Sequence, residues 1–194
     1  SFYGEDSSFL RSLDQMHEIF MADVHKNQHI YHQDPDPIGP PAKSKHGRKP
    51  SRLNAQTEPM RIDQWVQQPP DDAWRRLTLR DTTKGKLQVD ILHQRVWLWD
   101  GEEKQAQHWH LVVRREVKSS KIKYSLSNAP ESTTVKRLAY MQTQRYWVER
   151  SFQDSKTSCG MSDYQARGWR SWHHHMALVM MAMLFMLEQR HSYK

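Results

Sequence analysis

From residue 142 the chain reads Gln142-Thr-Gln-Arg145-Tyr-Trp-Val-Glu149-Arg-Ser-Phe-Gln-Asp-Ser-Lys156. At about 100° per residue, Arg145, Glu149 and Lys156 fall within roughly 40° of one another on one face of a helix. The carboxylate on that face lies between two cations. Carboxylates bind hard metal ions, and guanidinium or ammonium groups bind phosphates. Such a face can therefore hold a metal ion and a phosphate together.

An apolar stripe runs along the same expected helix, made of Leu138, Met141, Val148 and Phe152. We expect one long helix over roughly 134–157, because cap-forming residues precede it and Gly160 follows it. The three charges lie along the edge of the stripe, which places them at the lip of the core. The competing interpretation is an ordinary solvated face with ion pairs between positions four and seven apart.

The spacing of Arg145, Glu149 and Lys156 resembles the end of the Y-R-E-K signature of insertion-sequence DDE transposases. Two later segments are similar to the C-terminal part of that catalytic domain: Gly160-Met-Ser-Asp-Tyr164-Gln-Ala-Arg167-Gly-Trp169 and Trp172-His-His-His-Met-Ala-Leu-Val. In that family the glutamate is the third metal-binding carboxylate of a ribonuclease-H-like nuclease.

The resemblance implies a role for each matching residue. Glu149 would bind the catalytic metal, and Arg145 and Lys156 would contact the phosphate backbone near the transposon end. Arg167 would contribute a further DNA contact. Gln142 stands where the signature has its tyrosine, so a sister group without that tyrosine matches better.

The order of elements also agrees with the resemblance, because strand-like runs over 74–126 precede the expected helix, as a mostly β insertion does in the family. We expect an α/β fold, a partial ribonuclease-H-like domain with a β-rich insertion before the Glu-bearing helix. Four parts are expected: a core segment following the second catalytic Asp (1–32), a basic Pro-rich loop (33–62), the β-rich insertion (63–120), and the last core strand, the Glu-bearing helix and the C-terminal helix (121–194).

The opening Ser1-Phe-Tyr3-Gly4 resembles the stretch just after the second catalytic Asp of the family. The resemblance places that Asp immediately upstream of Ser1, and the first catalytic Asp further upstream. Two-metal cleavage of a phosphodiester needs several bridging carboxylates, which Glu149 alone cannot supply. We therefore expect this chain to be inactive by itself. Asp23, in the strand-like run 18–25, is a weaker alternative ligand.

Charge favours a polyanionic partner, because Lys and Arg number 29 against 22 Asp and Glu and the pI is near 9.5. Residues 33–52 are rich in proline and then basic, so nothing there can bury a core. We expect an extended loop that follows a phosphate backbone, and a solvated linker is the alternative. The cations concerned are Lys43, Lys45, Arg48, Lys49 and Arg52.

Several other features have simpler explanations. Trp97, Trp99 and Trp109 alternate along strand-like runs and indicate sheet packing more than base stacking. The residues of His173-His-His point about 100° apart on a helix, so they cannot converge on one ion. The apolar run 176–187 is too short to span a bilayer and predicts a buried helix. Cys159 is the single cysteine, which excludes an internal disulfide and favours the reducing cytosol.

The resemblance implies that the full-length protein is a transposase that cuts and rejoins DNA with two Mg²⁺ or Mn²⁺ ions. Its partners would be transposon ends, target DNA and a second copy in a synaptic homodimer. It would work in the bacterial cytosol, at the nucleoid. Two alternatives stay open. In the first, the chain is a catalytically dead remnant that binds DNA or the intact transposase. In the second, it is an unrelated basic α+β domain.

Overall fold

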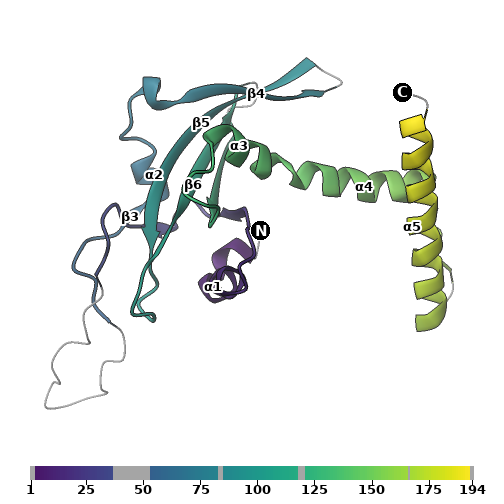
Figure 1. The fold of residues 1–194 in the computed structure, drawn as a ribbon, viewed down its shortest axis with the longest axis horizontal. Coiled ribbons are helices and arrows are strands. Elements are labelled where there is room, and N and C mark those ends of the chain that lie inside the picture. The colour runs from purple at the N-terminus through teal and green to yellow at the C-terminus, as the bar shows by residue number, and fades with distance from the viewer. Residues whose placement is uncertain (1–2, 37–52, 83–84, 118–120, 166, 193–194) are drawn as a thin grey trace, which may run out of the picture. The chain divides into compact units, whose positions relative to one another are not determined.

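The computed structural model describes residues 3–36, 53–82, 85–117, 121–165 and 167–192 (Figure 1). The chain forms two compact units, Ser1–Gln142 and Thr143–Lys194. Each unit is described by itself below.

The first unit is built on a five-stranded antiparallel sheet in the order β1-β7-β6-β5-β4. Its strands are β1 (Ala22–Val24), β4 (Arg75–Thr82), β5 (Gly85–Leu98), β6 (Gln107–Glu116) and β7 (Ile122–Ser127). A separate pair joins β2 (His29–Ile30) to β3 (Met60–Arg61). The strand-like runs expected over 74–126 are confirmed as β4 to β7, and β5 pairs with β6 as an antiparallel hairpin.

The mixed α/β class is confirmed, and the ribonuclease-H-like arrangement stays a prediction. So does the division into core and insertion. Strands β4 to β6, expected in the insertion, and β1 and β7 belong to one sheet. The expectation of a buried strand over 18–25 is wrong in extent, because β1 has three residues and all are half-buried. β1 is the edge strand of the sheet and pairs with β7 alone.

One face of the sheet carries the larger core. Leu10 of α1 (Ser7–Gln15), Ile30 of β2, and Ile62 and Trp65 of α2 (Ile62–Trp65) pack there against the sheet. The sheet supplies Leu92, Val96, Leu98, Trp109, Leu111, Val113 and Leu126. α1 begins at Ser7 because Asp6 caps it, its side chain accepting a hydrogen bond from Phe9 N at 3.0 Å.

The opposite face packs against α3 (Val135–Thr143), whose Leu138 and Ala139 meet Val89, Ile91 and Val112. Short 3-10 turns, η1 (Tyr3–Glu5) and η2 (Asp71–Ala73), complete the unit. At Gly4 an added Cβ would lie 1.8 Å from the backbone oxygen of Asp23. Glycine therefore allows η1 to lie directly against β1.

The expected single helix over 134–157 is wrong at one point, because Gln144 separates α3 from α4 (Arg145–Ser158). Gln142 and Thr143 at the end of α3 are buried, which fixes that end. Tyr146, Trp147 and Val148 are exposed and are modest helix formers, so they favour the continuation of one straight helix only weakly. The predicted terminator is confirmed. Gly160 adopts a φ of 70°, and the backbone N–H groups of Cys159 and Met161 both donate to Ser155 O.

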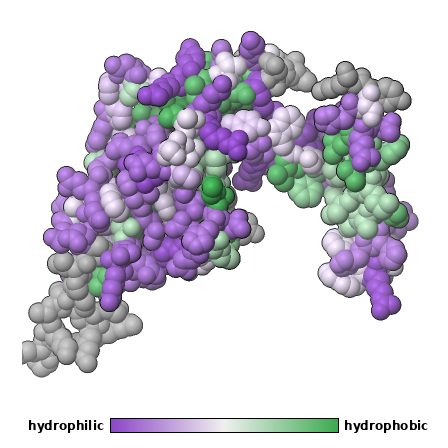
Figure 2. All heavy atoms as spheres, viewed as in Figure 1, coloured by the Kyte–Doolittle hydropathy of each residue, from purple (hydrophilic) through white to green (hydrophobic). Residues whose placement is uncertain are grey.

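The second unit holds α4 and α5 (Trp169–Ser192). The expectation that the apolar half of α5 is buried is wrong. Val179 is buried, whereas Leu178, Met181 and Phe185 are each more than 60% exposed, and apolar surface is visible on this unit in Figure 2. Composition alone predicted burial, and α5 meets few partners among the described residues. None of the described helices is long and apolar enough to cross a membrane.

Candidate metal and phosphate site

The structure brings two of the three signature residues into contact. Arg145 Nε donates to Glu149 Oε1 at 3.1 Å, one turn apart on α4, and the two side chains are 61% and 65% exposed. Lys156 is exposed in the last turn of α4. It follows Glu149 by about two turns, or roughly 10 Å along the axis. The three residues therefore share one open helical face.

The expectation that these charges lie at the lip of a core is wrong. Leu138 is buried in α3, but Val148 and Phe152 on α4 are 56% and 53% exposed. The break at Gln144 interrupts the stripe, so its two halves lie on different helices. The geometry of Arg145 and Glu149 is that of a solvated pair four residues apart, which contributes little to stability.

A two-metal centre needs more carboxylates than the described residues assemble. Within the ranges that the structure describes, no group of three or more His, Cys, Asp or Glu side chains could hold a metal ion. Glu149 is accessible and acidic, and Mg²⁺ prefers such oxygen ligands. Its role as a metal ligand stays a prediction.

Gln142, at the signature position, is a buried contact of the sheet. Its Nε2 donates to Ser125 Oγ at 2.8 Å, and Ser125 Oγ in turn donates to Asp23 Oδ1 at 2.6 Å. This chain of hydrogen bonds links α3 to β7 and β1. Asp23, the weaker candidate ligand, is therefore already engaged inside the first unit.

The remaining predicted DNA contacts divide into two groups. Lys43, Lys45, Arg48, Lys49 and Arg52 lie outside the described residues. Arg167 is described and exposed, in the segment before α5. Its DNA contact stays a prediction. Further along, His173 Nδ1 lies 3.0 Å from Trp169 O and His175 Nε2 lies 2.9 Å from Gly160 O, so both rings contact backbone carbonyl groups within the second unit.

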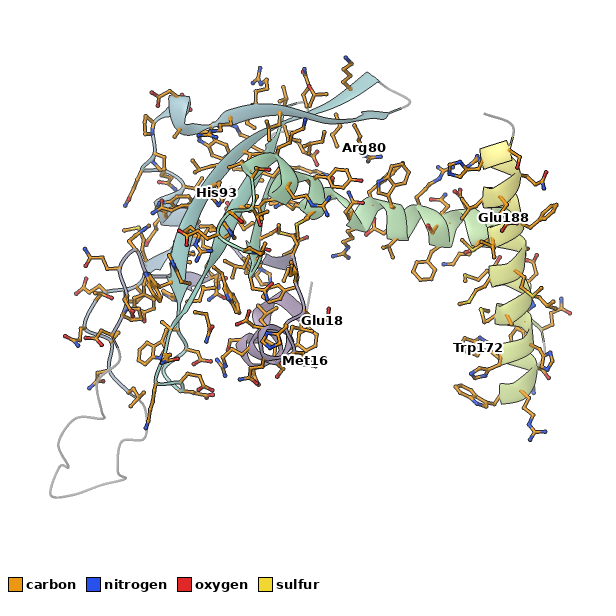
Figure 3. All side chains as sticks on the ribbon, viewed as in Figure 1. Met16, Glu18, Arg80, His93, Trp172 and Glu188 are labelled. Atoms are coloured by element: carbon orange, nitrogen blue, oxygen red, sulfur yellow. The ribbon has the colours of Figure 1, made fainter. Side chains whose placement is uncertain are left out.

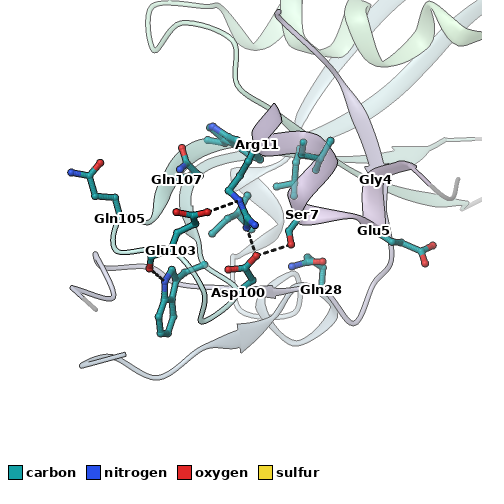
Figure 4. A pocket seen from close by; sticks show the side chains of 14 residues that line it. Gly4, Glu5, Ser7, Arg11, Gln28, Asp100, Glu103, Gln105 and Gln107 are labelled. Atoms are coloured by element: carbon teal, nitrogen blue, oxygen red, sulfur yellow. Dashed lines mark hydrogen bonds and ion pairs between the residues drawn. The ribbon is translucent and has the colours of Figure 1, made fainter. Parts of the chain in front are cut away.

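A small pocket lies beside η1, at the end of the sheet where β5 meets β6 (Figure 4). Asp100 accepts a hydrogen bond from Ser7 Oγ at 2.8 Å and pairs with Arg11. Burial raises the pKa of Asp100, but the hydrogen bonds from Arg11 and Ser7 outweigh burial and leave that pKa below its usual value. With a volume of about 50 Å³, the pocket has no room for a nucleotide.

Sequence reasoning missed a row of charges across three strands. Arg76 of β4 lies opposite Asp90 of β5, which lies opposite Arg115 of β6. Arg76 donates to Asp90 from Nε at 2.9 Å and from NH2 at 3.2 Å, and Arg115 NH2 lies 3.5 Å from Asp90 Oδ2. The hydrogen bond from Arg76 lowers the pKa of the Asp90 carboxyl. The lengths of the turns between the strands fix this register, so the row could have been inferred from the sequence by placing those turns.

A histidine pair on the opposite face was also missed. His110 Nε2 lies 3.1 Å from Ala129 O. The same atom lies 3.2 Å from Pro130 O and 3.3 Å from Arg95 NH1. Both carbonyl oxygens only accept and both lie closer than the guanidinium, so we assign the proton to Nε2. His110 Nδ1 must then accept from His93 Nε2, which is 2.8 Å away. Burial, helped by His110 and Arg75, lowers the pKa of His93 to about 4. His93 is labelled within the sheet in Figure 3.

Comparison with known protein families bears on the first unit. Residues 1–86 match the family of DDE superfamily endonucleases. The matched segment runs from η1 to the start of β5 and covers less than half of the chain. DDE endonucleases as a family act on DNA and use divalent metals. Glu149 lies beyond the matched residues. A comparison with curated proteins gave no match to the chain.

Proposed function

We propose that this chain is the C-terminal part of a transposase catalytic domain that cleaves DNA strands and transfers them to a target. The observation that carries the proposal is the match of residues 1–86 to DDE superfamily endonucleases. The Arg145, Glu149 and Lys156 face follows that segment in the order that the transposase signature requires. Match and signature lie in different parts of the chain and support each other.

In this proposal Glu149 joins two aspartates, which the resemblance places upstream of Ser1, as a ligand of Mg²⁺ or Mn²⁺. Metal ions held there would supply an activated water or hydroxyl and stabilise the leaving oxygen. Arg145 holds the Glu149 carboxylate by its 3.1 Å hydrogen bond. Arg145 and Lys156 keep further N–H groups for the phosphate backbone. The protein acts on transposon ends and target DNA as a synaptic homodimer, in the bacterial cytosol at the nucleoid.

The test uses the protein extended upstream to include both aspartates. Glu149→Gln keeps the size of the side chain and removes its charge, so we expect Mg²⁺-dependent nicking of a transposon-end duplex to fall by at least about 100-fold. Asp154→Asn is the matched control, because Asp154 forms a similar exposed pair with Arg150 at 2.9 Å on the same helix. Equal nicking by wild type and Glu149→Gln would remove the metal role.

A second candidate function is a catalytically dead remnant that binds DNA or the intact transposase. The exposed Glu149 favours it, because the described residues give that carboxylate no partner acid for a metal. A gel-shift experiment on the 194-residue chain separates the two functions when combined with the nicking assay. Salt-sensitive DNA binding together with no Mg²⁺-dependent nicking by the extended protein is the expected result for a remnant.

A further inference from the structure

The strongest unassigned feature is the cross-strand row of Arg76, Asp90 and Arg115. Asp90 is 7% exposed, at the margin of the larger core, whereas the Arg76 side chain is 61% exposed. The carboxylate is thus a buried anchor beneath guanidinium groups that reach the surface. The pKa of Asp90 is lowered by these partners, so the anchor stays ionised at neutral pH.

Arg115 has a second support. Its guanidinium carbon lies 4.4 Å from the centroid of the Trp74 ring, in a cation–π contact. A flexible side chain loses conformational entropy when it binds a ligand, and part of that loss has already occurred here. The row therefore presents two arginines that are largely fixed before any ligand arrives.

The row also carries an excess of positive charge, because one carboxylate faces two guanidinium groups. Arg76 uses Nε and NH2 on Asp90, and Arg115 uses NH2. Each guanidinium has five N–H groups, so several donors on each arginine remain for another acceptor. Planar N–H pairs of this kind match the oxygens of a phosphate.

The surroundings are basic at the same end of the sheet. Lys86 lies four residues before Asp90 on β5, Lys121 directly precedes β7 and Lys123 lies on it; all three are exposed. A carboxylate also lies at this end, that of Glu116 of β6, whose Oε1 lies 3.7 Å from Arg114 NH2, and the cations outnumber it. The opposite end, at the β5–β6 turn, carries Asp100, Glu102 and Glu103 around Arg11. Figure 1 shows the start of β5, where Gly85 pairs with Thr82, and the β5–β6 turn at opposite ends of the strands. Charge is therefore polarised along the sheet.

We propose that Arg76 and Arg115, held by Asp90 and Trp74, form a docking point for the phosphate backbone of duplex DNA. A polyanion fits the excess charge, and a regular spacing of phosphates fits cations distributed along one end of a sheet. The contact positions DNA without reading its sequence. The choice of DNA rests on the proposed function, but the contact needs no metal and is separate from Glu149.

The test measures binding of a fluorescent 30-base-pair duplex to the 194-residue chain by anisotropy, in EDTA and over a series of salt concentrations. We expect Arg76→Gln/Arg115→Gln to weaken binding about 10-fold at low salt. The slope of log K against log salt should fall by about 1 to 2, because each lost phosphate contact removes about 0.9. Lys104→Gln/Lys136→Gln removes the same charge at exposed positions outside the row and is the matched control.

Equal losses in the two double variants would overturn the proposal, because net charge alone would then explain binding. Arg76→Lys/Arg115→Lys retains both charges and a partner for Asp90, and covers the case in which the glutamine variant does not fold. We expect this variant to keep the slope of log K against log salt and to bind about 3-fold more weakly, because an ammonium group lacks the planar pair of N–H donors of a guanidinium. Unchanged affinity would overturn the role of the guanidinium groups. Tighter binding of single-stranded RNA than of the duplex would overturn the choice of ligand.

The two experiments distinguish a failure of the docking point from a failure of the proposed function. Loss of DNA binding in Arg76→Gln/Arg115→Gln with Mg²⁺-dependent nicking retained by Glu149→Gln in the extended protein would support the docking point and contradict the metal role. Unchanged DNA binding by Arg76→Gln/Arg115→Gln, together with loss of nicking by Glu149→Gln, would contradict the docking point alone.

Discussion

Arg145 Nε lies 3.1 Å from Glu149 Oε1, and both side chains are more than 60% exposed on α4. Water screens such a pair, so it adds at most a few tenths of a kcal/mol to stability. A buried residue that packs in the core would contribute much more to stability.

Glu149→Gln should therefore leave the free energy of unfolding of the 194-residue chain within about 0.5 kcal/mol of wild type. Urea denaturation followed by circular dichroism measures this change, and Arg145→Gln should give the same result. A loss above 2 kcal/mol would mean that the pair supports the fold. Its exposure would then be no argument for a DNA or metal site.

Asp90 presents the contrasting case, because its carboxylate is buried between two guanidinium groups. Asp90→Asn should destabilise the first unit by about 2 kcal/mol, since hydrogen bonds to a charged group are lost there. The effect has a pH signature. The folded pKa of Asp90 is lowered, so its contribution is present above its unfolded pKa near 4 and is lost as pH falls through the folded value. Chemical denaturation of wild type and Asp90→Asn at pH 7 and pH 3 should show the difference shrinking in acid.

Much of the sheet follows from the sequence because strand residues alternate and polar turns interrupt them. Once the turn between Leu98 and Gln107 is placed, Asp90 necessarily faces Arg115, so that part of the charge row was predictable. The helix break at Gln144 was not, because the 3.6-residue periodicity continues through it. Exposure of Phe185 was also beyond reach, since an apolar composition says nothing about which surface covers it.

The candidate site was predictable as a pattern on one helix and not as an assembled centre. Spacing alone placed Arg145 and Glu149 one turn apart, and their contact confirms that geometry. The role of Gln142 depends on contacts with β7 that lie far away in sequence. Such contacts have no local periodicity, and no sequence pattern in this chain predicts them.

His93 should make stability depend on pH in mild acid. Its folded pKa is about 4, whereas an unfolded histidine titrates near 6.5. Below pH 6.5 the unfolded chain takes up a proton that the folded chain rejects, so stability falls as pH drops from 6.5 to 4 and is fully present above that window. A fully buried ring would lose about 3 kcal/mol; because water screens the partly exposed His93 ring, we expect about half of that.

Chemical denaturation of wild type and His93→Gln at pH 7.0, 5.5 and 4.5 tests this. We expect a flatter pH profile in the variant. His174→Gln is the control, because that side chain is exposed on α5. Identical slopes in wild type and His93→Gln would show that another group titrates in this range.

Gln142→Tyr would restore the signature tyrosine at the position where this chain has a buried amide. Gln142 is 7% exposed, and its Nε2 donates to Ser125 Oγ at 2.8 Å. A phenol ring is larger than the amide side chain and cannot reproduce that donation in the same space, so we expect destabilisation of about 1 to 3 kcal/mol. Gln142→Met, which nearly keeps the size and removes the donor without adding a charge, separates the lost hydrogen bond from overpacking. Thermal melting of both variants decides the point. A Gln142→Tyr variant as stable as wild type would mean that α3 can shift to accept the ring, and the chain of hydrogen bonds from Gln142 through Ser125 to Asp23 would then not constrain the end of that helix.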